Sequence, residues 1–239
     1  MNLTVDTTYR SELPELMDDF DLKGEQLRDT LDKIASINRR LGGNRVTLEG
    51  VRKLIRDVPA DKKIKIIDVG CGNGDMLRDL ADYADSCGRK FSLIGIDANA
   101  DTIAYATKMS LHYPDISFKR ENIFDADFRT HSCDIVLSTL TMHHFSDNEI
   151  VEMMETFSRQ ASIGIVINDL HRSAIAYRLF HLVCFVFGLG HMSKSDGLVS
   201  ILRGFKRSDL QKFSDKLKFK KFSIRWKWAF RYQWIIYTT

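Results

Sequence analysis

Short apolar runs alternate with helical periods between residues 63 and 170. The runs are rich in β-branched and aromatic residues, which predicts strands. They lie at residues 64–69, 91–96, 116–120, 134–137 and 163–167. Apolar residues three or four positions apart between the runs predict helices, and the capping box from Ser146 to Glu149 begins one of them. Repeated strand–helix units of this kind predict a parallel sheet covered on both faces.

The two ends of the chain show different patterns. In the first sixty residues, Leu27, Leu31, Ile34 and Leu41 form one helical stripe that Gly42-Gly43 ends, and a second helix is predicted from Thr47 to just before Pro59. Near the other end, apolar and polar residues alternate over 222–228 and again over 230–236, which predicts an antiparallel hairpin. We therefore expect a helical N-terminal lid (1–60) in front of one folding unit (61–239).

The most apolar stretch, residues 174–189, contains Arg178 and His181. It is shorter than the ~20 apolar residues that a membrane span needs, so no integral span is expected. One interpretation is a buried helix. The other is the apolar wall of a substrate site or a peripheral membrane contact. In either case we expect residues 173–205 to cover a ligand site at the edge of the sheet.

Charge is distributed unevenly along the chain. The net charge of the 239 residues is +3. Residues 202–239 hold eleven Lys and Arg against two acidic residues, a net charge of +9, which leaves −6 for residues 1–201. Because many of these charges alternate with Phe222, Ile224, Trp226 and Trp228, we expect most of them on the solvated face of the hairpin, and no nucleic-acid partner.

The cysteines and the N-terminal residues indicate the cellular compartment of the protein. Cys71, Cys87, Cys133 and Cys184 are widely separated and form no C-x-x-C pair, so neither a metal site nor a disulfide framework is expected. The first residues are polar and acidic, without an apolar signal core. We therefore expect a cytoplasmic protein.

A glycine-rich loop, residues 70–74, lies between the first predicted strand and its helix. Glycines there allow a tight turn and let a ligand approach the backbone amides. The spacing differs from G-x-G-x-x-G because Asp75 stands where the third glycine is expected. Acidic neighbours suit a ligand with a positive centre and an ammonium group. At the tip of the second strand, Asp97 can accept hydrogen bonds from both hydroxyls of a ribose.

At these motifs the chain resembles the class I S-adenosylmethionine-dependent methyltransferases. The similar segments are DVGCGNGD (68–75), IGIDAN (94–99), FKRENIFDADFRTHSCDIV (118–136) and DIVLSTLTMHHF (134–145). The resemblance implies S-adenosylmethionine as cofactor. It also implies a Rossmann-like α/β fold, with a seven-stranded, mostly parallel sheet, an antiparallel terminal strand and helices on both faces.

The resemblance also implies which residues bind the cofactor. The glycine loop lines the methionine moiety, Asp97 holds the ribose, Asn122 and Ile123 take the adenine edge, and Ser138 sits under the sulfonium. The full set is Asp68, Gly70, Cys71, Gly72, Gly74, Asp97, Ala98, Asn122, Ile123, Phe124 and Ser138.

The residues after the fourth strand constrain the acceptor. Enzymes that methylate amide or base nitrogens resemble one another in an N/D-P-P-Y motif, whereas this chain has Ser138-Thr139-Leu140-Thr141. No Pro-Cys pair offers a thiolate for cytosine methylation. Whatever the acceptor is, methyl transfer needs an acceptor atom aligned with the methyl group and a group that removes the acceptor's proton.

Three histidines are candidates for that group. The segment His143-His144-Phe145-Ser146-Asp147 is similar to the H-D-W-S-D stretch of plant-type O-methyltransferases. The resemblance implies that His143 is the general base, although His144 replaces Asp and a packing or capping role for these histidines stays open. His171, after the fifth strand, is the other catalytic candidate. Arg172 beside it is a candidate to pair with a carboxylate or phenolate of the acceptor.

A narrower resemblance rests on LMDD (16–19), RRLGGNR (39–45), NDLHR (168–172) and WKWAFR (226–231). These segments are similar to bacterial small-molecule methyltransferases associated with type III polyketide synthases. They imply O-methylation of a small lipophilic acceptor that is phenolic or polyketide-derived. Two alternatives stay open: a C-methyltransferase acting on a quinone-type ring, and a non-catalytic cofactor-binding scaffold whose basic tail binds RNA or a partner.

Overall fold

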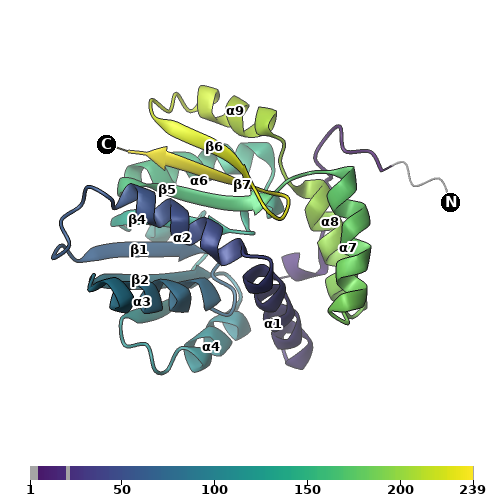
Figure 1. Ribbon diagram of the computed structural model, residues 1–239, viewed down its shortest axis with the longest axis horizontal. Coiled ribbons are helices and arrows are strands. Elements are labelled where there is room, and N and C mark those ends of the chain that lie inside the picture. The colour runs from purple at the N-terminus through teal and green to yellow at the C-terminus, as the bar shows by residue number, and fades with distance from the viewer. Residues whose placement is uncertain (1–4, 20–21, 239) are drawn as a thin grey trace.

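A seven-stranded sheet forms the centre of the computed structural model, which describes residues 5–19 and 22–238 (Figure 1). The strand order is β3-β2-β1-β4-β5-β7-β6. β1 to β5 pair in parallel, and β7 runs antiparallel to both of its neighbours. The predicted fold class is therefore confirmed. The strands are β1 (Ile64–Val69), β2 (Phe91–Asp97), β3 (Ile116–Arg120), β4 (Cys133–Thr139), β5 (Ala161–Leu170), β6 (Phe222–Lys227) and β7 (Arg231–Tyr237).

Helices cover both faces of the sheet (Figure 1). α2 and α3 contribute to the core on one face, and α6 and α9 contribute to the core on the other. The helices are α1 (Glu25–Arg40), α2 (Gly43–Leu54), α3 (Asp75–Cys87), α4 (Ala100–Met109), α5 (Ala126–Arg129), α6 (Asp147–Gln160), α7 (Ala174–Val186), α8 (His191–Arg203) and α9 (Arg207–Lys216), with 3-10 turns η1 (Leu16–Asp18) and η2 (Met142–His144). Among the described residues, no helix has the length and apolar character that a membrane crossing requires.

The strand order places a crevice between β1 and β4. The chain proceeds from β1 towards β2 and β3 on one side, and from β4 towards β5 on the other. Ligands of open α/β sheets bind at such a switch point, at the carboxyl ends of the strands. Here the loop after β1 meets the loop after β4, because Thr141 Oγ1 donates to the Gly70 carbonyl at 3.3 Å.

The two predicted N-terminal helices have different positions. α2 begins at Gly43 rather than at Thr47, directly after Gly42 in the left-handed conformation. It packs on the sheet so closely that a Cβ on Gly50 would lie 2.5 Å from the Val166 side chain. Residues 43–54 are thus part of the sheet's cover, whereas α1 stands at the carboxyl end of the strands (Figure 1). Residues 1–4 and 20–21 of the expected lid lie outside the described residues.

The interpretation of residues 174–189 as a buried helix is wrong. α7 packs against α8 beside the sheet rather than on one of its faces (Figure 1). Its Ile175, Leu182, Phe185 and Val186 side chains are exposed, Phe185 by 85%. Because the helix is apolar on nearly all sides, its sequence pattern does not indicate which side faces solvent.

The basic residues of the C-terminal segment are mostly exposed, as expected. They lie on α9, on the turn before β6 and on β6 itself, so the hairpin carries only part of them. Arg203 and Arg231 are buried exceptions.

We predict that Asp134 stabilises the fold in its charged form. Its carboxylate accepts hydrogen bonds from Lys62 Nζ, the Lys65 amide and Ser162 Oγ, each at 2.9 Å, and so joins the starts of β1, β4 and β5. Although partial burial acts to raise it, these bonds hold the pKa of Asp134 below its ordinary value. Asp134→Asn is expected to lower the free energy of unfolding near neutral pH by about 1.5 kcal/mol.

The pH dependence follows from the depressed pKa. The stabilisation is present above the unfolded-state pKa of about 4 and is lost as pH falls through the folded-state value. Urea denaturation at neutral and acid pH measures it. Asp57→Asn is the control, because Asp57 pairs with Arg56 on the surface. A difference between wild type and Asp134→Asn that stays constant into acid would contradict the assignment.

Candidate functional site

A cavity of about 910 Å³ runs along the carboxyl edge of the sheet. Its volume is within the range of small-molecule and cofactor sites. The loops after β1, β2 and β3 line one part of the cavity, called here its first end, and η1, η2, α7, α8 and the β6–β7 turn line its second end. α1 also lines the cavity and adjoins the glycine loop, because Asn73 Nδ2 donates to Asp32 at 2.9 Å. One continuous space therefore joins the predicted cofactor residues to the predicted catalytic histidines.

Backbone atoms of the glycine loop form the wall at the first end. The Gly70 and Cys71 amides donate to the Ile96 carbonyl at 2.8 and 3.1 Å, which holds the turn against β2. Gly70 has a φ of 70°, and a Cβ there would lie 2.3 Å from the Thr141 side chain. A larger residue at position 70 would be both strained and obstructed.

Carboxylates gather around this loop. Asp97 accepts from the Asn99 amide at 3.0 Å and the Gly72 amide at 3.4 Å, and burial raises its pKa. Burial, followed by the nearby charges of Asp75 and Asp97, raises the pKa of Asp68 well above its ordinary value. A positively charged ligand relieves this concentration of like charge. The loop therefore suits the ammonium and sulfonium groups of S-adenosylmethionine.

The predicted cofactor residues divide into two groups. Those that line the cavity are Gly70, Gly72, Asp97, Ala98, Asn122, Ile123 and Phe124. Asp68, Cys71, Gly74 and Ser138 are not among the lining residues. Cys71 is buried in the core, where its Sγ would lie 2.9 Å from a Cβ on Gly95, and Ser138 is buried within β4. These residues lie behind the wall of the cavity.

His143 lies in η2, directly after β4, and is buried. Its Nδ1 is 2.7 Å from Asp169 Oδ1, and its amide donates to Asp169 Oδ2 at 3.2 Å. Although burial acts to raise it, the charge and hydrogen bond of His143 hold the pKa of Asp169 below its ordinary value. An ionised Asp169 accepts the Nδ1 proton of this ring, so in the neutral form of the imidazole Nε2 is the acceptor.

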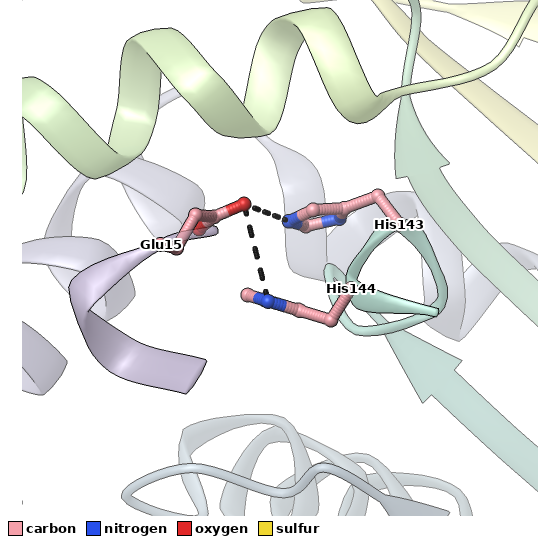
Figure 2. A group of neighbouring side chains, drawn as sticks. All are labelled: Glu15, His143 and His144. Atoms are coloured by element: carbon pink, nitrogen blue, oxygen red, sulfur yellow. Dashed lines mark ion pairs between the residues drawn. The ribbon is translucent and has the colours of Figure 1, made fainter. Parts of the chain in front are cut away.

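Glu15 joins the two adjacent histidines from the N-terminal segment (Figure 2). Its Oε1 lies 3.7 Å from His143 Nε2 and 3.9 Å from His144 Nδ1. Oε1 has no hydrogen-bond partner among the described residues, whereas Oε2 accepts from Ser200 Oγ at 2.7 Å. Burial raises the pKa of Glu15 to about 7. The second end of the cavity thus holds a buried polar cluster of Glu15, His143 and His144.

Arginines fix this cluster in place. From α8, Arg203 donates to the His143 carbonyl at 3.1 Å and to Asp18 Oδ2 at 2.6 Å. Asp18 in turn lies 2.6 Å from His144 Nδ1. Arg10 donates to the His143 carbonyl at 3.0 Å. The N-terminal segment is therefore held against η2 and α8 by charged hydrogen bonds.

His171 also lines the cavity, but its ring is engaged differently. Trp226 Nε1 lies 3.2 Å from His171 Nδ1. Because an indole N–H only donates, Nδ1 is the acceptor, and the neutral ring carries its proton on Nε2. Burial, with the charges of Arg172 and Lys206, lowers the pKa of His171. At neutral pH this histidine presents a donor, not a base.

Arg172 is buried but is not among the lining residues. Its guanidinium donates to the carbonyls of Thr7 at 3.0 Å and Gly204 at 2.5 Å, and to Asp209 at 3.0 Å. These bonds attach the N-terminal segment to the turn between α8 and α9. The arginine that does line the cavity is Arg231, at the start of β7.

Sequence reasoning missed Glu15, Asp169 and Arg231. Asp169 ends a predicted strand at the carboxyl edge of the sheet, which was a usable signal. Glu15 meets His143 only through the tertiary fold. Arg231 occupies a polar position of an alternating strand, which usually indicates a solvent-facing side chain.

Residues 66–164 match a protein-family profile described as a methyltransferase domain. The chain therefore carries a methyltransferase domain. The match includes the glycine loop, Asp97, Asn122 and both adjacent histidines. The prediction of an S-adenosylmethionine-dependent methyltransferase is confirmed. A search of curated protein sequences finds no significant match.

Solved methyltransferase structures share the fold. The plantazolicin methyltransferase BpumL in complex with SAH aligns with a TM-score of 0.66 and 16% identity over 86% of this chain and 89% of that chain. Magnesium protoporphyrin IX methyltransferase from Synechocystis PCC 6803, with bound SAM, gives 0.56 and 13% over 92% and 86%. The citrinin polyketide synthase CMeT domain gives 0.59 and 19% over 79% and 50%.

We predict that Asp97 and the space above Gly70 are needed for cofactor binding. Asp97→Ala is expected to weaken S-adenosylmethionine binding about tenfold or more, because hydrogen bonds to a charged acceptor are lost. Gly70→Ala is expected to weaken it as well, because the new Cβ displaces Thr141. Calorimetry measures both effects, with the exposed Asp115→Ala as control. An unchanged dissociation constant in Asp97→Ala would contradict the assignment.

Proposed function

We propose that the chain transfers a methyl group from S-adenosylmethionine to a phenolic oxygen of a small lipophilic acceptor. The observation that carries the proposal is the single cavity with a glycine loop and Asp97 at one end and the Glu15–His143–His144 cluster at the other. The wall between them is largely apolar and includes Leu27, Leu31, Ile37, Leu179, Phe180 and Val183. An apolar cavity with a few convergent polar groups suits a lipophilic ligand.

His143 is proposed as the group that takes the hydroxyl proton. When bound, S-adenosylmethionine supplies an electrophilic methyl group on a sulfonium sulfur, and its transfer leaves S-adenosylhomocysteine. The acceptor's O–H proton would pass to His143 Nε2, which leaves a lone pair of the oxygen free to attack the methyl group. Asp169 would stabilise the imidazolium that results, because its Oδ1 lies 2.7 Å from Nδ1 of the ring.

The apolar elements around the cavity are proposed to exclude water. α1 is joined to the glycine loop and to α4, because Asp32 accepts from Asn73 Nδ2 at 2.9 Å and from Tyr105 Oη of α4 at 2.6 Å. The N-terminal segment (5–19) and residues 173–205 complete the cover. We assign the lid to these parts of the chain, and the methyltransferase domain to α2 together with the remainder of 61–239.

The acceptor class is favoured by two features. The resemblance to methyltransferases associated with type III polyketide synthases implies phenols or resorcinols. The exposed apolar side chains of α7 adjoin the part of the helix that lines the cavity. A helix of this kind suits an acceptor that partitions into membranes, with peripheral contact there. C-methylation of a quinone-type ring, the alternative, is tested by offering quinone-type acceptors beside the phenols in the turnover assay.

We predict that His143 contributes more to turnover than His171. His143→Ala is expected to lower the rate about 100-fold or more, because proton removal is lost. His171→Ala is expected to have a smaller effect, because its Nδ1 is occupied by Trp226. Single-turnover assays on a 5-alkylresorcinol measure both, with exposed His112→Ala as control.

Two results would overturn the assignment of the base. Wild-type turnover in His143→Ala would exclude the imidazole. Loss of turnover in a chelator, restored by Zn²⁺, would instead make the cluster a metal site, since one atom from each of Glu15, His143 and His144 lies within 4.8 Å of the others.

We also predict a dependence on the acceptor's alkyl chain. Each additional CH₂ buried against the apolar wall is worth about 0.8 kcal/mol, so KM is expected to fall up to about fourfold per carbon until the cavity is filled. A homologous series of 5-alkylresorcinols measures this. A KM that is independent of chain length would contradict an apolar acceptor site.

A further inference from the structure

Arg231 is a buried cation with unused hydrogen-bond donors in the wall of the cavity. Arg231 is 3% exposed. Its Nε and Nη1 have no hydrogen-bond partner in the described part of the chain. A buried guanidinium is costly unless it is paired and hydrogen-bonded. A ligand that accepts hydrogen bonds from this guanidinium would lower that cost.

The fold makes room for this side chain. A Cβ on Gly43 would lie 2.8 Å from the carbon at the centre of the Arg231 guanidinium. The neighbouring carboxylate, Asp169, acts on Arg231 through its charge. Asp169 already accepts bonds from the His143 amide, from the His143 ring and from the Leu170 amide. Because the negative charge of Asp169 is shared with these donors, it neutralises the positive charge of Arg231 only in part.

The strand order places Arg231 at the acceptor end. β7 is separated from β1 by β4 and β5, which is three strand spacings, or about 14 Å. The glycine loop follows β1, so this spacing separates the backbone of β7 from it, whereas the Arg231 side chain extends to Gly43 at the start of α2. Arg231 pairs instead with Leu170, next to the Asp169 that holds His143.

We propose that Arg231 binds a carboxylate of the acceptor, which makes the substrate a hydroxyaryl carboxylate with a lipophilic substituent. This inference rests on the proposed function and names its substrate class. The guanidinium presents parallel N–H donors that match a carboxylate in two hydrogen bonds. The hydroxyl then lies towards His143, which Asp169 of the neighbouring strand β5 holds, and the alkyl substituent lies along the apolar wall.

The test compares matched ligands. Calorimetry on the enzyme saturated with S-adenosylhomocysteine measures binding of a 2,4-dihydroxy-6-alkylbenzoate and of the 5-alkylresorcinol with the same alkyl chain. The wild type is expected to bind the carboxylate about tenfold more tightly or better, because a charge-assisted pair forms. Arg231→Met is expected to remove this preference, and Arg231→Lys to keep part of it.

Controls separate the possible outcomes. Arg225→Met removes an exposed arginine of the same hairpin and is expected to keep the preference. Thermal melts check that the variants fold, and Arg231→Lys retains the charge if Arg231→Met does not fold. Equal affinity of the wild type for both ligands would overturn the inference. Weaker S-adenosylhomocysteine binding in the variants, with the preference intact, would also overturn it, because the guanidinium would then serve the cofactor's carboxylate.

The inference and the proposed function can fail separately. Arg231-dependent binding of the benzoate without methylation of any phenol would support the anion site and refute O-methylation. Methylation of the neutral resorcinol, with no preference for the carboxylate, would support O-methylation and refute the anion site.

Discussion

The acceptor end of this cavity depends on the buried negative charge of Asp169. A carboxylate so far from water stays ionised only if hydrogen bonds and opposite charges stabilise it. The His143 ring and amide and the Leu170 amide supply the bonds. The same charge fixes the proton of His143 on Nδ1 and acts on Arg231 across the adjoining strand. Asp169, near the end of β5, therefore positions both the proton acceptor and the anion site that we propose.

The two ends of the cavity are built by different means. At the cofactor end, backbone conformation decides the shape: Gly70 has a positive φ, and Thr141 occupies the space above it. Side chains there mainly supply negative charge. At the acceptor end, the polar groups are side chains from distant segments, with Glu15 from the N-terminal segment and His143 from η2 (Figure 2). The first kind of site tolerates little substitution, whereas the second can change its specificity one side chain at a time.

This difference explains how much the sequence predicted. The strands and the glycine loop depend on local periodicity and on local turn chemistry, so β1 and β3 were predicted with the bounds that the structure has. Glu15 was missed because its contact with His143 spans more than a hundred residues. Arg231 was missed because β7 lies inside the sheet, between β5 and β6, where both faces of the strand are buried. α7 was uncertain because a helix that is apolar all round gives no pattern from which to choose its outward face.

The same reasoning changes the meaning of the basic C-terminal segment. Most of its charges are solvated, but two of its arginines are buried where the fold needs a cation. Arg203 holds Asp18 and the backbone of His143 and His144, so it positions the N-terminal segment over the polar cluster. Arg231 keeps unused donors beside the cavity. The excess of positive charge is therefore partly an internal requirement: acidic groups brought in by the N-terminal segment need a partner, and the anionic acceptor that we propose needs a cation to bind it.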